Sequence, residues 1–313
     1  MILCISPNAG LDRVMVVPGF AVAGVFRAAH LLVMASGKGI NVARAIARLD
    51  GEATATAMLG GETGARIAAL TAAEGLKGIW TPIDGETRTN IIIVDPDSGA
   101  ATVINEQGPR VSAGDWARFQ ADAVRAAQQT PPAAITVSGS VPPGVTPDAF
   151  ESFLAALTDP GCPVWVDTSG EPLHAALRIA QGRFAIKVNG EEVSAILGSP
   201  ARDVQSARAA ARALRDRGAA AAVLTLGARG AVYAAEDGEW FAETAPIRPV
   251  SAVGSGDSFM AGLLLSFARG APTGDALRCA AAAGAANALS PGSGIFSRED
   301  FKSALATSRA TPL

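Results

Sequence analysis

The sequence has few of the residue types that build metal centres and disulfide frameworks. It holds two histidines and three cysteines among 313 residues. His30 and His174 have no second ligand at a suitable spacing, which argues against a zinc centre and against a histidine-based triad. Cys4, Cys162 and Cys279 are scattered through apolar stretches and are expected to be buried, reduced thiols. Carboxylates, lysines, arginines and backbone amides must therefore supply the chemistry.

Long apolar runs and basic clusters are also missing. The longest apolar stretches, such as the alanine-rich run at 280–289, fall short of the roughly 18 residues that span a bilayer. The start, MILCISPN, lacks the basic head of a signal peptide. The formal net charge is −3, and no basic run is interleaved with aromatic residues, so neither nucleic acid nor a membrane is expected as a partner. A cytoplasmic location and a small-molecule partner are the expectations.

Short apolar runs alternate along the chain with stretches of helical period. Most of these runs are followed by a glycine or proline turn, and 49% of the residues are hydrophobic, which is enough for a full core. The pattern predicts an α/β protein whose mostly parallel central sheet is covered by helices on both faces. No repeat or linker divides the chain, so we predict one domain over residues 1–313. The predicted strands are MILCIS, ATATAML, AAITVSGS, PVWVDTS, RFAIKVN and AAVLTLG.

Two regions depart from this alternation, at about 12–34 and about 86–109. Both read as strands joined by turns, without helices between them. We expect them to form a small β sheet that projects from the core as a lid. The last hundred residues add a hairpin, VYAAEDGEWF, and then three helices, the middle one nearly all alanine.

Polar residues that follow strands are the first candidates for a site, because open α/β sheets bind ligands at the carboxyl ends of their strands. In ASGKGINVARAIARLD, Gly37, Lys38 and Gly39 begin a helix, and Lys38 and Asn41 share a face near its positive end, which suits an anion. A glycine-bounded helix start with a surface lysine is the structural alternative. The segment matches neither a Walker A loop nor a dinucleotide fingerprint.

A second candidate is TRTNIIIV, in which Arg88 and Asn90 point to one face of a strand. Both can then reach one ligand, and the guanidinium can hold a phosphate through two hydrogen bonds. A solvated arginine on an edge strand is the alternative.

Two further segments follow predicted strands. In IKVNGEE, Asn189 and Glu192 have the spacing of a capping box, which is a sufficient structural reason for both residues. In TLGARG, Gly227 and Gly230 offer a flat loop for a nucleotide, although turn glycines are common.

The stretch VSAVGSGDSFMAGLLLSF places Asp257 behind Gly254, Ser255 and Gly256 at the start of an apolar helix. Consecutive amides at such a start form a nest for an oxyanion, and the glycines let a phosphate approach the backbone. A carboxylate in a first helical turn is by itself a routine favourable choice. The stretch therefore leaves open whether Asp257 caps the helix or acts on a ligand.

Seven segments together resemble the ribokinase/PfkB family of sugar kinases, in order and in spacing, from about residue 2 to about residue 300. More narrowly, they are similar to its phosphosugar branch, which includes 1-phosphofructokinases, tagatose-6-phosphate kinases and the minor 6-phosphofructokinase. The segments are SGKGINVARAIARL, ETRTNIIIV, VSGSVPPGV, VDTSGEPL, IKVNGEE, TLGARGAVY and VSAVGSGDSFMAGLL.

The resemblance implies a ribokinase-like three-layer sandwich with a β lid, often a dimer through that lid. It also implies a carbohydrate kinase that uses ATP and Mg²⁺, with a monovalent cation as a further candidate. By the same resemblance, Asp257 matches the catalytic base, Gly254, Ser255 and Gly256 match the anion hole, and Glu192 matches a magnesium-linked position. The positions that match ATP contacts are Lys187, Asn189, Thr225, Gly227, Gly230 and Asn287. Those that match sugar-phosphate contacts are Asp12, Arg27, Gly37, Lys38, Asn41, Arg88 and Ser138, with Asn90 added because it shares the face of Arg88.

Three positions depart from the family pattern: Ala9 follows Asn8, Val188 precedes Asn189, and Ser36 stands where many members have glycine. They bear on loop geometry rather than on reaction type. The resemblance favours a kinase of ketohexose phosphates, with fructose 1-phosphate first and tagatose 6-phosphate or fructose 6-phosphate as alternatives. A non-catalytic sugar-phosphate-binding protein is the alternative from another class. A nucleoside kinase is disfavoured because Lys38, Arg88 and Arg27 supply more positive charge than a neutral acceptor needs.

Overall fold

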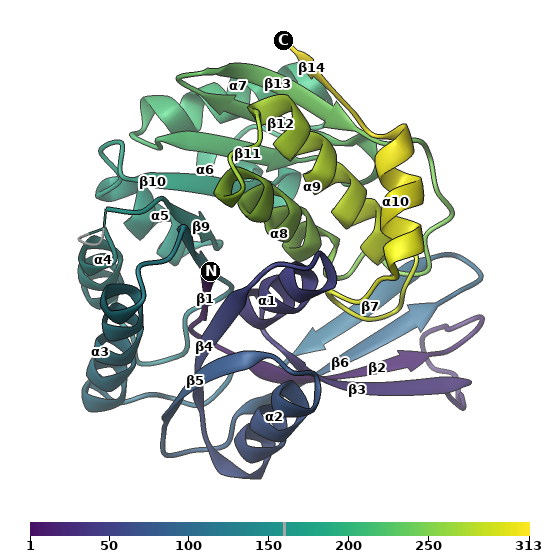
Figure 1. Ribbon diagram of the computed structural model, residues 1–313. Helices are drawn as coiled ribbons and strands as arrows, with labels where there is room; N and C mark the ends of the chain where they lie inside the picture. The colour runs from purple at the N-terminus through teal and green to yellow at the C-terminus, as the bar shows by residue number, and fades with distance from the viewer. Residues whose placement is uncertain (159–160) are drawn as a thin grey trace.

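The computed structural model describes residues 1–158 and 161–313, which form two β sheets and the helices around them (Figure 1). The strands of the larger sheet are β1 (Ile2–Ser6), β4 (Ala53–Leu59), β5 (Lys77–Pro82), β8 (Ala134–Ser138), β9 (Val164–Asp167), β10 (Phe184–Asn189), β11 (Ala221–Thr225), β12 (Ala231–Ala235), β13 (Gly238–Glu243) and β14 (Arg309–Pro312). Their spatial order is β14-β13-β12-β11-β10-β9-β8-β1-β4-β5. The pairs from β11 to β5 are parallel, and the pairs from β11 to β14 are antiparallel.

Helices cover both faces of this sheet. They are α1 (Lys38–Arg48), α2 (Gly61–Ala73), α3 (Ala113–Gln129), α4 (Pro147–Ala156), α5 (Glu171–Arg178), α6 (Gly190–Leu197), α7 (Val204–Asp216), α8 (Ser255–Ala268), α9 (Thr273–Ala288) and α10 (Arg298–Thr307), with a 3₁₀ turn η1 at Gly227–Arg229. Alternate residues of β1 enter different cores: Leu3 and Ile5 pack with α3 to α7, whereas Ile2 and Cys4 pack with α1, α2, α8 and α9. The layers are therefore helix, sheet and helix, as predicted.

The smaller sheet consists of β2 (Gly10–Val16), β3 (His30–Ser36), β6 (Arg88–Asp95) and β7 (Ala100–Asn105), in the order β3-β2-β6-β7. Figure 1 shows it projecting to one side of the larger sheet. Its packed face carries Val14, Met34, Ile92 and Val94. The two regions expected to lack helices thus form one four-stranded sheet within the described residues, and β2 begins two residues earlier than predicted.

The end of the chain follows the expectation in part. The hairpin β12–β13 and the three helices α8, α9 and α10 are present in the described residues. Strands β5 and β14 were not predicted. Both carry several exposed residues, so neither has the apolar run of a buried strand. In the portion of the chain that the structure describes, no helix combines the length and apolarity that a membrane crossing requires.

Candidate active site

The polar candidates gather where α1 and α8 begin, beside the carboxyl ends of the parallel strands. Figure 1 shows these two helices side by side over the sheet. Gly39 lets α1 approach β1 closely, because a Cβ there would lie 2.7 Å from the carbonyl carbon and oxygen of Ile5. The arrangement brings the first turns of two helices, and their partial positive charges, to one edge of the sheet.

A hydrogen bond between Asn41 and Asp257 joins the starts of these two helices. Asn41 Nδ2 donates a hydrogen bond of 2.8 Å to Asp257 Oδ2, although the residues are 216 positions apart. The side chain of Asp257 is 6% exposed. Burial raises the pKa of Asp257 to about 6, against the lowering effects of Lys38, Lys187 and the Asn41 hydrogen bond. Its carboxyl group is therefore a base that is ionised at neutral pH and protonated under mildly acidic conditions.

Asp167 at the end of β9 holds two lysines. Its Oδ1 accepts from Lys38 Nζ at 2.8 Å, and its Oδ2 accepts from Lys187 Nζ at 2.6 Å. Burial alone would raise the pKa of Asp167, but the two ammonium groups overcome this and lower the pKa to about 2. Lys38 Nζ also lies 3.5 Å from Glu192 Oε1. The result is a group of opposite charges next to Asp257, in which Asp167 and Lys187 are buried and Lys38 is partly exposed.

The loop before α8 is shaped by its glycines. Gly254 has φ +80°, and a Cβ there would lie 2.5 Å from Ser293 Cβ, so a side chain does not fit. A Cβ at Gly256, the second residue of α8, would lie 3.2 Å from Lys187 Nζ, which places this lysine beside the start of the helix. The expected nest of three outward amides needs one correction: the amide of Ser255 donates to Ala252 O at 3.2 Å, because the chain turns there before the helix begins. The amides of Gly254 and Gly256 remain the candidates for an oxyanion.

Arg88 and Asn90 share one face of β6, as predicted. Both lie against Gly10, where a Cβ would be 2.9 Å from Asn90 Nδ2 and 3.1 Å from Arg88 Cγ. Asn90 donates to Asp12 Oδ1 at 2.8 Å, and both side chains are buried. Arg88 donates to Asn8 O at 2.8 Å and to Glu106 O at 3.1 Å.

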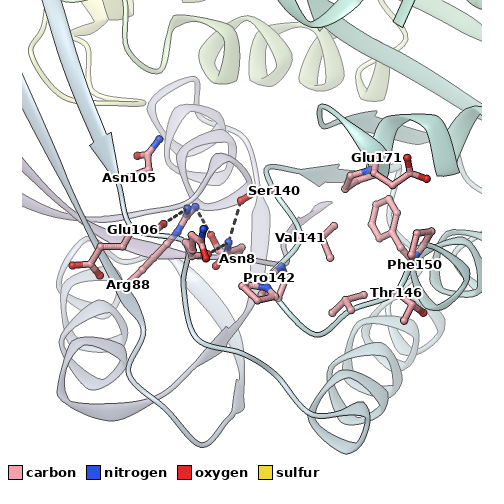
Figure 2. A pocket seen from close by; sticks show the side chains of 15 residues that line it. Asn8, Arg88, Asn105, Glu106, Ser140, Val141, Pro142, Thr146, Phe150 and Glu171 are labelled. Carbon is pink, nitrogen blue, oxygen red and sulfur yellow. Dashed lines mark hydrogen bonds between the residues drawn. The ribbon is translucent and has the colours of Figure 1, made fainter. Parts of the chain in front are cut away.

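A cavity of about 580 Å³ opens next to Arg88. Figure 2 shows Arg88, Asn8 and Ser140 on one side of it, joined by hydrogen bonds, and Phe150 and Glu171 on the other. The loop after β8 borders both this cavity and the lysine group, since a Cβ at Gly139 would lie 3.7 Å from Lys38 Cβ. This loop is the link between the two, since Asp257, Lys38 and Lys187 do not themselves line the cavity.

Two of the predicted contact residues are committed to the protein interior. Asn287 is fully buried: its Nδ2 donates to Val253 O at 2.8 Å, and its Oδ1 accepts from Ser258 Oγ and Gly294 N. The side-chain amide therefore supports the loop before α8 in this structure, and the expected place of Asn287 near the adenine stays a prediction. Ser138 is also fully buried, with its hydroxyl 2.6 Å from that of Thr136, so only its backbone can meet a sugar phosphate.

The remaining candidates have simple local roles. Asn189 and Glu192 form the capping box of α6 that the spacing predicts, with Glu192 Oε2 accepting from Asn189 N at 2.8 Å. Gly227 and Gly230 bound a 3₁₀ turn rather than a flat loop, and Thr225 is half-buried at the end of β11. Arg27 is exposed on the segment between β2 and β3, and among the described residues no hydrogen bond joins it to the site.

Sequence reasoning missed two residues of this region, Asp167 and Arg44. Asp167 ends a strand, so the rule that selected the other candidates also applies to it. Arg44 gave no comparable signal, because an arginine in an amphipathic helix is expected to face solvent. It is instead 2% exposed and lies behind Asn41.

Glu192 is the residue here best suited to a magnesium ion. The described residues include no cluster of three or more His, Cys, Asp or Glu side chains arranged to hold a metal. Mg²⁺ in kinases takes most of its ligands from phosphates and water and needs only one or two carboxylates. Both oxygens of Asp167 are held by lysines, whereas Glu192 Oε1 has only a 3.5 Å contact with Lys38. The donors present therefore fit a nucleotide-bound magnesium ion rather than a protein-held one.

Known proteins are similar to this chain over most of its length. The family described as "pfkB family carbohydrate kinase" matches residues 4–300. A 1-phosphofructokinase of Escherichia coli K12 is 33% identical, over 87% of this chain and 86% of that protein. A 1-phosphofructokinase of Rhodobacter capsulatus is 34% identical, over 90% and 88%. The crystal structure of E. coli phosphofructokinase-2 in complex with fructose-6-phosphate superimposes with a TM-score of 0.86 at 28% identity, over 97% of this chain and 98% of that one. The chain belongs to the pfkB family of carbohydrate kinases.

Proposed function

We propose that this kinase transfers the γ-phosphoryl group of ATP to a hydroxyl of a ketohexose phosphate, with fructose 1-phosphate as the preferred acceptor. The observation that carries the proposal is the buried carboxyl group of Asp257, held by Asn41 and faced by Lys38 and Lys187. The choice of fructose 1-phosphate is supported by the activity named for the relatives at 33% and 34% identity.

The residues divide the work of phosphoryl transfer between them. Asp257 accepts the proton of the acceptor hydroxyl, and the hydroxyl oxygen attacks the γ-phosphorus. The bond between the γ-phosphorus and the bridging oxygen of the β-phosphate breaks, and ADP leaves. Lys38, Lys187 and the amides of Gly254 and Gly256 stabilise the negative charge on the transferred group. Because the site is buried, these charges act with less screening by water than they would on the surface.

Magnesium binds with the nucleotide in this proposal, with Glu192 as the carboxylate that faces it. When bound, Mg²⁺ neutralises phosphate charge. Asn189 holds Glu192 in place through the capping box. Thr225, Gly227 and Gly230 lie at the end of the neighbouring strand and are proposed to face the nucleotide. A monovalent cation stays a further candidate.

ADP release across a panel of acceptors tests the proposal. The panel contains fructose 1-phosphate, fructose 6-phosphate, tagatose 6-phosphate, ribose and adenosine, each with MgATP. We expect the highest kcat/KM with fructose 1-phosphate. Preference for fructose 6-phosphate would instead assign the activity of a 6-phosphofructokinase, as the complex of E. coli phosphofructokinase-2 with fructose-6-phosphate suggests. No release with any acceptor would favour a non-catalytic binding protein.

Arg88→Ala is expected to raise KM for the sugar phosphate at least about tenfold and KM for ATP less than about twofold. Arg88 borders the cavity, and its Nε is buried without a hydrogen-bond partner among the described residues. Steady-state kinetics with each substrate varied in turn measures the difference. Arg125→Ala is the control, because that arginine is exposed on α3. An equal rise in both KM values would show that Arg88 is not a contact of the sugar phosphate.

We further propose a cytoplasmic homodimer joined through the smaller sheet. This sheet and its loops carry exposed apolar side chains, which a partner could cover. They are Val22, Val25, Phe26, Leu31, Val103 and Ile104. Light scattering that gives the mass of one chain would contradict the dimer.

A further inference from the structure

Arg44 lies directly behind the contact between Asn41 and Asp257. Asn41 and Arg44 are three residues apart on α1 and share a face of that helix. Arg44 Nη1 donates to Asn41 Oδ1 at 3.1 Å, and Asn41 Nδ2 donates onward to Asp257 Oδ2 at 2.8 Å. A continuous chain of hydrogen bonds therefore joins the guanidinium to the carboxyl group of Asp257.

The guanidinium of Arg44 is fully paired. It has five N–H groups, and the structure supplies five acceptors. Nη1 donates to Asn41 Oδ1 and to Ser293 O at 3.2 Å. Nη2 donates to Ala35 O at 2.7 Å and to Glu74 Oε1 at 3.2 Å, and Nε donates to Glu74 Oε2. A buried group with every donor satisfied has one orientation, because any rotation breaks several bonds at once.

This pairing decides which way the amide of Asn41 points. A guanidinium can only donate, so the Asn41 atom that faces Arg44 must be the oxygen. The amide nitrogen must then face Asp257. With the amide reversed, an N–H would meet a cation and an oxygen would meet a carboxylate, and both contacts are repulsive. Arg44 thus ensures that Asn41 donates a hydrogen bond to Asp257 Oδ2.

Arg44 also ties three other segments to this point. Ala35 lies near the end of β3, in the smaller sheet, and Glu74 follows α2. Ser293 packs against Gly254, the residue that caps the start of α8. One side chain of α1 therefore bonds to the base of the smaller sheet, to the end of α2 and to the segment that packs against the start of α8.

We propose that Arg44 is a positioning residue for phosphoryl transfer, which fixes the Asn41 amide so that Oδ2 of Asp257 is held and Oδ1 is presented to the acceptor hydroxyl. Among the described residues, no side-chain hydrogen bond reaches Asp257 Oδ1. This inference rests on the role of Asp257 under the proposed function. It adds a residue that touches neither substrate and acts through Asn41.

A double-mutant cycle tests the proposal with Arg44→Lys, Asn41→Leu and the double variant. Lysine keeps the positive charge beside Glu74 but cannot reproduce the planar fork. We expect Arg44→Lys to lower kcat by about tenfold to a hundredfold while KM for ATP stays within about twofold. In the Asn41→Leu background the same change should alter kcat by less than about twofold, because the amide through which Arg44 acts is gone.

Arg215→Lys serves as the matched control. Arg215 is a half-buried arginine of α7 that donates to the carbonyl of Ala235, and α7 packs on the face of the sheet opposite to α1 and α8. Its kcat should stay at the wild-type value. Thermal melting establishes that each variant is folded at the assay temperature. If Arg44→Lys is not folded, the pair Arg44→Gln with Glu74→Gln removes both charges together, and it should lower kcat by the same factor.

Two results overturn the assignment while leaving the proposed function intact. The first is a folded Arg44 variant whose kcat is within about threefold of wild type. The second is an equal factor lost in the wild-type and Asn41→Leu backgrounds, which would mean that Arg44 affects the site by another route. Wild-type protein that releases no ADP with any acceptor would remove the proposed function, and this assignment with it.

Discussion

Asp257→Asn will lower kcat by about 10²- to 10⁴-fold, the range that a positioned general base contributes. The amide cannot accept the proton of the acceptor hydroxyl, but it has the shape of the carboxyl group and can still meet Asn41. KM for ATP should change by less than about threefold. In the wild type, kcat/KM for the acceptor should fall as pH drops below about 6, the pKa of the buried carboxyl group. The residual activity of Asp257→Asn should lack this acidic limb.

The same substitution should stabilise the fold. The pKa of Asp257 is raised from 3.8 to about 6, so the folded state binds this proton more tightly than the unfolded state does. Stability therefore falls as pH rises through this window, and at neutral pH the ionised carboxylate costs about 2–3 kcal/mol. Asparagine removes this cost, and urea unfolding at neutral pH should show the gain.

Asp275→Asn is the control for both effects. Asp275 is also in the first turn of a helix, α9, but its side chain is 60% exposed and, among the residues that the structure describes, forms an ion pair with Arg278 alone. Neither kcat nor unfolding free energy should change by a comparable amount. Near-normal turnover of Asp257→Asn would show that another group takes the proton.

Asp167→Asn is expected to destabilise the protein by about 3–5 kcal/mol, the usual cost of removing one partner from a buried ion pair. Most of this loss of stability comes from Lys187, because its side chain is 5% exposed and its charge would be left buried without a partner. The side chain of Lys38 is 35% exposed and can be hydrated. The pKa of Asp167 is lowered to about 2, so its stabilisation is present above about pH 4 and is lost as pH falls toward 2. Urea unfolding at neutral pH measures the loss.

A double variant that removes both charges tests whether the loss of stability comes from an unpaired buried lysine. Asp167→Asn with Lys187→Met leaves no uncompensated buried charge, so it should be more stable than Asp167→Asn alone. Glu239→Gln is the control, because Glu239 also lies between two cations, Arg208 and Arg212, whose side chains are 34% and 55% exposed. Exposed pairs of this kind contribute up to about 1 kcal/mol. A loss of that size for Asp167→Asn would mean that water reaches the lysines.

Local patterns predicted the elements well where near neighbours decide the structure. The capping box from Asn189 to Glu192 joins residues three apart, so its spacing alone specified the start of α6. The six apolar runs predicted as strands are all strands, because burial on both faces requires continuous apolar residues. Strand β14 was not predicted, since only its pairing with β13 makes it a strand.

The residues of the candidate site also fall into those that the sequence predicted and those that only the structure revealed. Motif order identified Asp257, Lys38 and Asn41, and strand alternation placed Arg88 and Asn90 on one face. The internal support that Asn287 gives was not predicted, because a polar residue in an alanine-rich helix indicates function or internal support equally well, and only its hydrogen bonds to Val253, Ser258 and Gly294 reveal the support. Arg44 was missed because nothing local distinguishes a buried arginine from an exposed one.

By itself, the amino-acid sequence determined the α/β layering, the two helix starts rich in glycine and the family, because periodicity, capping and motif spacing depend on residues close together in the chain. The tertiary structure alone decided that Asp257 meets Asn41 across 216 residues, that Asp167 holds two lysines, and that Arg44 is buried behind them. The physical reason is that burial and charge pairing depend on distance in space, and burial is also what raises the pKa of Asp257.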